Sequence, residues 1–203
     1  MSNIKELKQC ADDGNIDAML EYGIILFHGD GVQANRAEAA RYFKLAADNG
    51  SEEGMAQYAQ MLQLGEGIPA NKPEAAKYYQ MAAEKNCYGA MHNYALMLHN
   101  GDGIPVNKPL SAQYFKTAAD HGIVNAMFSY ASMCLIEDGI PINREEGAKY
   151  TKMAADNGHV QAMRAYASLL EKGVGVPVNT TEARKYRNMA DNQSSSSKCC
   201  ILI

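Results

Sequence analysis

The side chains best suited to chemistry lie at the C-terminal end of this 203-residue chain. Cys200 is followed by two aliphatic residues and a final isoleucine, which is the C-a-a-X pattern of a prenylated cysteine. A serine run just before it predicts a flexible tail over residues 193–203, and prenylation requires such an accessible thiol. A bulky aliphatic last residue favours a geranylgeranyl over a farnesyl group, although the two classes overlap. The alternative interpretation is an apolar terminus that arose by chance.

A second thiol, Cys199, is adjacent and is the candidate for S-acylation. One lipid chain gives only marginal membrane binding, ~0.8 kcal/mol per buried CH₂, so stable anchoring takes two signals. Nearby basic side chains could attract anionic lipid, or could form an ordinary solvated helix face. These side chains are Arg184, Lys185, Arg187 and Lys198. The tail therefore predicts a lipoprotein attached peripherally to the cytosolic face of a membrane.

Other candidates for chemistry are weak. His92 and His99 are seven residues apart, whereas metal-binding pairs on a helix are three or four apart. The recurring G-x-G segments follow no predicted strand, so they do not fit a nucleotide-binding loop. The N-terminus shows no secretory h-region, and the longest apolar runs fall far short of the ~20 residues that span a bilayer. We predict no catalytic residue, metal site, cofactor or nucleic-acid partner.

A 36-residue repeat makes up nearly all of the chain before the C-terminal tail. The segment Glu74–Asn86 (E-A-A-K-Y-Y-Q-M-A-A-E-K-N) recurs at Glu38–Gly50, Ser111–Gly122, Glu146–Gly158 and, in frayed form, Glu182–Asn192. Such a period indicates an array of supersecondary units and not a single compact core. Charge is uneven along it, because residues 1–158 carry 13 basic against 20 acidic side chains and residues 159–203 carry 6 against 3.

Each repeat predicts two helices joined by a glycine-containing turn. The first half has apolar or small residues at i, i+1, i+4, i+5 and i+8, which is one helical face: Ala18, Met19, Tyr22, Gly23 and Leu26 in the first copy. The Gly ends this helix and an Asn then caps the second one. Asn35, Asn71 and Asn143 precede a Glu at capping-box spacing, whereas Asn107 lacks the Glu and should cap more weakly.

The cysteines outside the tail fall at unrelated repeat positions, which argues against disulfides and zinc and favours a reducing compartment. Cys10 stands where other copies have Ala46 and Ala82, and Cys134 where they have leucine. Since free cysteine behaves as a small buried hydrophobe, we predict both to be core residues.

The combination A-M-x-x-Y-A-x-x-L, G-x-G-(I/V)-P-x-N and E-A-A-x-Y-(Y/F)-x-x-A-A-x-x-G resembles the Sel-one-like repeat, a relative of the tetratricopeptide repeat. The resemblance implies an all-α, right-handed superhelical solenoid that acts as an adaptor or scaffold without catalysis. We accordingly expect an N-terminal capping helix over 1–14, a solenoid over 15–192, and the tail over 193–203. The five repeats would be 15–50, 51–86, 87–122, 123–158 and 159–192.

A protein or peptide partner is expected in the groove lined by the first helices of a monomer. Three rows of first-helix positions avoid the predicted core and vary from copy to copy, in a way that packing does not explain. They are Leu20/Ala56/His92/Phe128/Arg164, Glu21/Gln57/Asn93/Ser129/Ala165 and Phe27/Gln63/His99/Leu135/Glu171. Amide, imidazole and aromatic groups suit an extended peptide, so the candidate partner residues are Gln57, His92, Asn93, Phe128 and Arg164.

The sequence is also consistent with alternative functions. Proteins that combine such repeats with a C-terminal prenyl motif include regulators of fungal chitin synthases, so an activating subunit of a membrane enzyme is one alternative by resemblance. A bacterial effector lipidated inside a host cell is another. An enzyme or a small-molecule binder would need polar residues converging on one pocket, which the sequence does not show.

Overall fold

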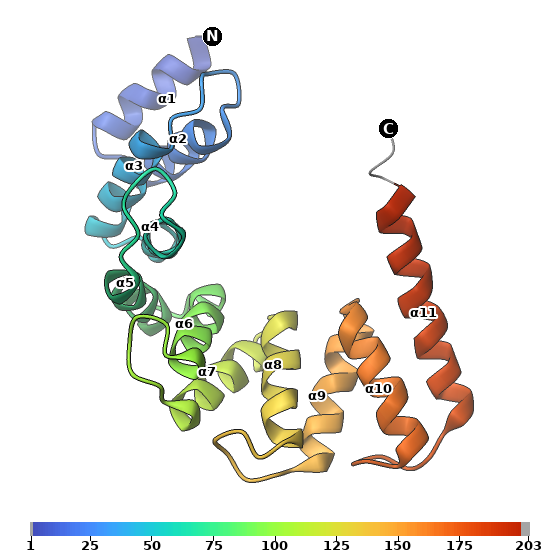
Figure 1. Cartoon of the computed structure of the whole chain (residues 1–203). Helices are drawn as coiled ribbons and strands as arrows, with labels where there is room; N and C mark the ends of the chain where they lie inside the picture. Colours follow the sequence, from blue (N-terminus) through green and yellow to red (C-terminus); the bar gives the residue numbers. More distant parts are fainter. Residues whose placement is uncertain (1, 200–203) are drawn as a thin grey trace. The chain divides into compact units, whose positions relative to one another are not determined.

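The computed structural model describes the backbone of residues 2–199 and the side chains of residues 4–193, and in this part of the chain all regular structure is α-helical (Figure 1). An initial helix, α1 (Ser2–Asp12), precedes five helix pairs. The first helices of the pairs are α2 (Ile16–His28), α4 (Glu52–Leu64), α6 (Tyr88–Asn100), α8 (Val124–Leu135) and α10 (Val160–Lys172). The second helices are α3 (Arg36–Asp48), α5 (Lys72–Glu84), α7 (Lys108–Asp120), α9 (Arg144–Asp156) and α11 (Thr180–Cys199). The predicted all-α repeat fold is confirmed.

The helices form two compact units, residues 1–106 (unit 1, α1–α6) and residues 107–203 (unit 2, α7–α11). Within each unit every helix packs against its neighbours in the chain. The predicted core face is confirmed, because α2 buries Ala18, Met19, Tyr22, Gly23 and Leu26. The equivalent positions are buried in α4, α6, α8 and α10. Alanine pairs on the second helices, such as Ala46 and Ala47, complete this core.

Asparagine caps begin the second helices as predicted. The side chain of Asn35 accepts a hydrogen bond from the backbone N–H of Glu38, and Asn107 makes the same bond to Leu110 at 3.1 Å without a glutamate. The capping box itself differs from the usual one. The Asn71 side-chain amide donates to Glu74 over 2.7 Å, while the Asn71 backbone N–H donates to the Leu62 carbonyl at the end of the preceding helix. Since that N–H is engaged, the glutamate accepts from the side chain instead.

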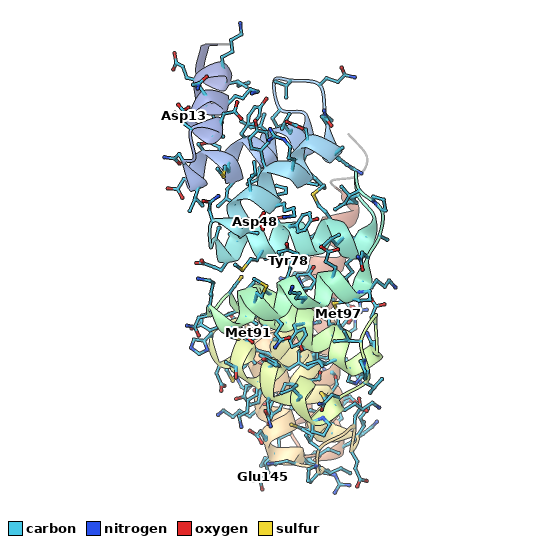
Figure 2. The ribbon with its side chains drawn as sticks, turned by 90° about the vertical axis from the view of Figure 1, so that its left-hand side faces the viewer. Asp13, Asp48, Tyr78, Met91, Met97 and Glu145 are labelled. Atoms are coloured by element: carbon cyan, nitrogen blue, oxygen red, sulfur yellow. The ribbon has the colours of Figure 1, made fainter. Side chains whose placement is uncertain are left out.

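A tyrosine–aspartate ladder joins successive second helices. Three tyrosine hydroxyls donate to an aspartate 30 residues earlier: Tyr42 to Asp12 (2.6 Å), Tyr150 to Asp120, and Tyr186 to Asp156 (2.5 Å). Asp48 and Tyr78 hold the corresponding places on α3 and α5 (Figure 2). Burial, together with the bond to Asp156, raises the pKa of Tyr186 to about 12, so this hydroxyl remains a donor at neutral pH.

One helix end departs from the pattern. Gly29, Gly65, Gly101 and Gly173 end the first helices with positive φ, but the equivalent residue after α8 is Glu137, with φ of 52°. A side chain in this left-handed region costs about 1–2 kcal/mol. Glu137→Gly should therefore raise the free energy of unfolding by about 1 kcal/mol, after allowing for the extra flexibility of glycine when unfolded.

Urea unfolding of the full chain checks this expectation. Asn86→Gly is the matched control, because Asn86 also has positive φ (66°) but asparagine tolerates that region, so its gain should be smaller. No gain for Glu137→Gly would mean that the turn after α8 is unstrained.

Candidate functional site

The candidate partner residue Gln57 lies beside a hollow of about 260 Å³ between α2 and α4. Its lining combines apolar and polar side chains: Ile24, Phe27, Phe43 and Met61, together with His28, Gln57, Gln60 and Glu66. Ile24 is 37% exposed, so part of this apolar side chain faces solvent beside the hollow. The guanidinium of Arg36 covers Phe27 at 4.9 Å from the ring centre and reaches Glu66 at 3.4 Å. This hollow offers an apolar slot with hydrogen-bonding groups at its edge.

His92 and Asn93 belong to a polar network inside unit 1. Tyr79, which is 1% exposed, donates its hydroxyl to Gln63 over 3.2 Å. The Gln63 amide donates to Asp102, and Asp102 pairs with Lys72 at 2.6 Å. Burial raises the pKa of Tyr79 to about 12, while a hydrogen bond with Asn93 acts in the opposite direction. Asn93 is therefore half-buried and engaged by Tyr79, and not simply an open amide.

Packing explains the variation at four positions of the row Phe27/Gln63/His99/Leu135/Glu171, which corrects the sequence interpretation there; the remaining residue, His99, contacts the side chain of the adjacent Asn100 at 3.0 Å. The other four side chains meet the second helix of their own repeat, 12 to 16 residues later. Phe27 and Phe43 line one hollow, Gln63 bonds Tyr79, Leu135 lies over Gly147, and Glu171 pairs with Arg187 at 2.6 Å. An apolar pair in one repeat is replaced by a hydrogen bond or an ion pair in another, so these positions join the two helices of each repeat.

In unit 2, Phe128 and Arg164 have partners of their own. The Phe128 ring stacks on His159 with ring centres 4.6 Å apart. Arg164 is exposed and approaches Asp191 of α11 at 3.4 Å. Gln57, His92 and Asn93 belong to unit 1, and Phe128 and Arg164 belong to unit 2.

The structure adds an outward stripe that sequence reasoning missed. Ile24 and Gln60 are equivalent positions, three residues after Glu21 and Gln57 on the same helical face, and both are exposed. The missed signal was available, since these positions also avoid the core and change from copy to copy.

His159 has a structural role that depends on its charge. Its Nδ1 accepts a hydrogen bond from the Ala162 backbone N–H at 3.1 Å and so caps α10. Only the neutral ring can accept, and burial lowers the pKa of His159 below its ordinary value. The unfolded chain therefore binds more protons, so this contribution to stability is present above pH ~6.5 and is lost as the pH falls.

Replacing this cap tests the pH dependence. His159→Asn keeps a capping side chain, as Asn15 does at the equivalent position of the first repeat, but cannot titrate. We expect the loss of stability between pH 7.5 and pH 5.5, measured by urea unfolding, to be smaller in the variant than in the parent. Burial also lowers the pKa of His92, so a residual dependence of the same sign should persist. An unchanged pH dependence would show that His159 does not act as a titrating cap.

The prediction of a core cysteine is confirmed for Cys134 and wrong for Cys10. Cys134 is 1% exposed, as predicted, and burial raises the pKa of its thiol, which keeps it neutral and unreactive. Cys10, by contrast, is exposed, so the prediction of a core residue is wrong there. Its counterpart Ala46 is enclosed because α3 packs between α2 and α4, whereas α1 has no first helix of its own to cover it.

The last helix also corrects the sequence interpretation, which ended it near Asp191 and placed a flexible segment from 193. α11 continues through the serine run to Cys199. Serine is a moderate helix former, no Gly or Pro interrupts the segment, and extending an existing helix costs much less than starting one. Cys200 and the side chain of Cys199, the two candidate lipid sites, lie outside the described residues.

α11 presents a polar outer face. Arg184, Arg187 and Asp191 occupy positions where every preceding second helix has a buried residue. Those buried residues are Ala40/Ala76/Ala112/Ala148, Phe43/Tyr79/Phe115/Thr151 and Ala47/Ala83/Ala119/Ala155. Polar substitution at all three positions is typical of a terminal repeat, whose outer face must be solvated. This favours the solvated-face interpretation of the basic residues on α11.

The residues that the structure describes contain no group of three or more His, Cys, Asp or Glu side chains arranged to hold a metal ion. Among the described helices, none combines the length and the apolar character needed to cross a membrane.

The five repeats match a known protein family. The family model of the Sel1 repeat matches residues 16–51, 52–87, 89–123, 124–159 and 160–190, which together make up most of the chain. The chain belongs to the Sel1 repeat family. These limits lie one or two residues from the predicted repeat boundaries. A search of curated proteins gave no significant match.

Several solved structures share the fold. A protective antigen of uropathogenic Escherichia coli superposes with a TM-score of 0.89 at 22% identity, over 92% of this chain and 40% of that one. The chain thus spans less than half of that protein's length. A Sel1 repeat protein from Oxalobacter formigenes gives 0.84 at 23% identity, covering 94% and 84%. An immunity protein from Pseudomonas aeruginosa gives 0.56 at 15%, covering 93% and 72%. At these identities the similarity establishes the Sel1-type fold alone.

Proposed function

We propose that this Sel1-repeat chain is a non-enzymatic scaffold whose first helices bind a protein or peptide partner. Sel1-repeat proteins in general are protein-interaction scaffolds. The observation that carries the proposal is the contrast between constant and variable positions. The buried positions of the first helices repeat almost unchanged, whereas the outward stripe reads Glu21-Ile24-His28, then Gln57-Gln60-Leu64, then Asn93-Leu96-Asn100. Gln57, Asn93 and Leu96 are half-buried, and the other six are exposed. Positions outside the core that differ while the core repeats are where a specific partner would be recognised.

The proposal includes a membrane tether. A prenyl group on Cys200, with an acyl group on Cys199 as the second anchor, would hold a monomeric chain on the cytosolic face of a membrane. α11 has 20 residues where the other second helices have 13, so it projects beyond its repeat by about 10 Å. A stiff projection of this kind would keep the repeats clear of the bilayer surface while the last residues reach it.

Partner capture tests the scaffold. The full chain, tagged at its N-terminus, is compared with a variant carrying Gln57→Ala, Phe128→Ala and Arg164→Ala; His92 and Asn93 are left intact because they support buried contacts of unit 1. The control carries Lys77→Ala, Lys149→Ala and Lys185→Ala, three exposed and equivalent positions on the second helices. We expect at least a tenfold loss of captured partner in the first variant, against less than twofold in the control, by quantitative mass spectrometry. Equal capture by both variants would place partner binding elsewhere.

A further inference from the structure

Two hollows follow one another between α2 and α4. The apolar hollow already described lies between the C-terminal halves of these helices. A second and more open hollow, of about 580 Å³, lies at their N-terminal ends and is lined by Asp17, Leu20, Glu52 and Glu53. Leu20 and Ile24 are one helical turn apart, as are Glu53 and Gln57, so the two hollows continue along one face. We call this continuous surface the α2–α4 groove.

The α2–α4 groove is acidic at one end. The helices α2, α4 and α6 contain no Lys or Arg, while α2 and α4 carry Asp17, Glu21, Glu52 and Glu53, all exposed. Unit 1 as a whole has 8 basic against 14 acidic residues, a net charge of −6. Asp17, Glu52 and Glu53 lie in the first turn of their helices, where the helix N-terminus stabilises a carboxylate. This stabilisation does not remove their negative charge.

In the part of the chain that the structure describes, the carboxylates of α3 have paired cations, whereas those of α2 and α4 do not. On α3, neighbouring cations balance the carboxylates: Lys44 pairs with Asp48 at 2.7 Å, and Arg41 pairs with Glu38 at 2.7 Å. On α5, Glu74 and Glu84 accept hydrogen bonds from the amides of Asn71 and Gln80. Within the described side chains, the four acids of α2 and α4 take part in no ion pair. The first-helix face of α2 and α4 therefore carries four carboxylates without a paired cation among the described residues, beside the hollow lined by Ile24 and Phe27.

We infer that the α2–α4 groove binds a short peptide segment in which basic residues are followed by one large apolar side chain. This inference rests on the proposed function and specifies the class of partner. Basic side chains would meet Asp17, Glu52 and Glu53, and the apolar side chain would enter the slot formed by Ile24, Phe27 and Met61. The amides of Gln57 and Gln60 offer both donors and acceptors to an extended backbone.

The dimensions fit a segment of this length. From Asp17 to His28 a helix rises about 16 Å, which equals about five residues of extended chain at ~3.3 Å each. A hollow of 260 Å³ is smaller than the usual ligand pocket of ~300–1,000 Å³ and suits a single side chain. The groove is thus sized for a linear motif.

The probe is the fluorescein-labelled peptide Lys-Arg-Lys-Gly-Leu, measured by fluorescence polarisation with the full chain. Two control peptides replace either the charge (Glu-Asp-Glu-Gly-Leu) or the apolar residue (Lys-Arg-Lys-Gly-Ser). We expect the first peptide to bind at least tenfold more tightly than either control, and its binding to weaken between 50 and 200 mM salt. Equal binding of the three peptides would overturn the inference.

Paired variants locate the binding. Glu52→Gln with Glu53→Gln should weaken the cationic peptides about tenfold, while Ile24→Ser should weaken the leucine peptide and leave the serine peptide unchanged. Glu145→Gln, an exposed acid on α9 of unit 2, is the charge control and should change nothing. Thermal unfolding of each variant separates lost binding from lost folding. Peptide binding that none of the groove variants alters would also overturn the inference.

The outcomes of these experiments distinguish failure of the peptide inference from failure of the proposed scaffold function. If the triple variant Gln57→Ala, Phe128→Ala and Arg164→Ala loses its captured partner while Ile24→Ser and the Glu52/Glu53 variant retain it, the scaffold stands and the basic motif is wrong. If the triple variant also retains its partner, the proposed binding face itself is wrong.

Discussion

Cys200→Ser should move the protein from the membrane fraction of a eukaryotic cell into the soluble fraction. The proposed prenyl thioether forms on this sulfur, so a hydroxyl cannot accept it. The repeats should stay folded, with the free energy of unfolding changed by less than about 0.5 kcal/mol, the range of substitutions away from structural features. Fractionation followed by immunoblotting measures the first effect, and urea unfolding the second.

Other cysteines provide the controls. Cys199→Ser should give partial release, because the prenyl chain would persist without its second anchor. Cys10→Ser changes an exposed thiol on α1 and should have no effect on fractionation. Mass spectrometry of the C-terminal peptide decides the chemistry: an unmodified Cys200 with its last three residues intact would remove the tether from the proposal.

Gly54→Leu should lower the free energy of unfolding by about 3 kcal/mol or more. Gly54 lies where α4 approaches α3, and a Cβ there would lie 2.7 Å from the Cβ of Ala46 and 2.8 Å from the backbone nitrogen of Ala47. Because the backbone of α3 cannot yield as a side chain does, even Gly54→Ala should lose about 1–2 kcal/mol, despite the better helix propensity of alanine.

Gly89 supplies the matched control within the same unit. It lies in the first turn of α6, and a Cβ there would meet no atom within 4 Å. Gly89→Ala should therefore stabilise the protein by about 0.5–1 kcal/mol, the ordinary gain of replacing glycine in a helix. Urea unfolding of both variants is the measurement, and effects of the same sign would mean that the α3–α4 contact does not limit the size of residue 54.

The repeat fold was predictable from sequence because its causes are local and periodic. The position of each first helix follows from apolar spacing, its end from a glycine with positive φ such as Gly65, and the start of the next helix from an asparagine such as Asn71. These signals recur every 36 residues, so each copy supports the interpretation of the others.

The errors arose where a residue's neighbours differ from those of its repeat equivalents. Cys10 matches Ala46 in register but lacks the covering helix, and α11 continues past Asp191 because no breaker residue ends it. A comparison of repeats assumes equal surroundings, and the first and last elements violate that assumption.

The candidate site was only partly predictable. Gln57 does border a hollow, but the row containing Gln63 and Glu171 varies because it pairs with Tyr79 and Arg187 across the repeat. Sequence shows that a position avoids the core stripe; it does not show which neighbouring helix reaches it. Ile24, in turn, was overlooked as an ordinary helix residue, and only its exposure beside Phe27 marks it as part of a surface slot.

Site-specific photocrosslinking tests most directly whether the first-helix face binds the partner. A benzophenone amino acid is placed in the full-length chain at Gln57 or Gln60 on α4, or at the exposed Lys77 on α5 of the same unit. After irradiation in cells, a first-helix partner should give a discrete crosslinked species from Gln57 and Gln60 and none from Lys77. Crosslinks from Lys77 alone, or equally from all three positions, would contradict a scaffold that binds through its first helices.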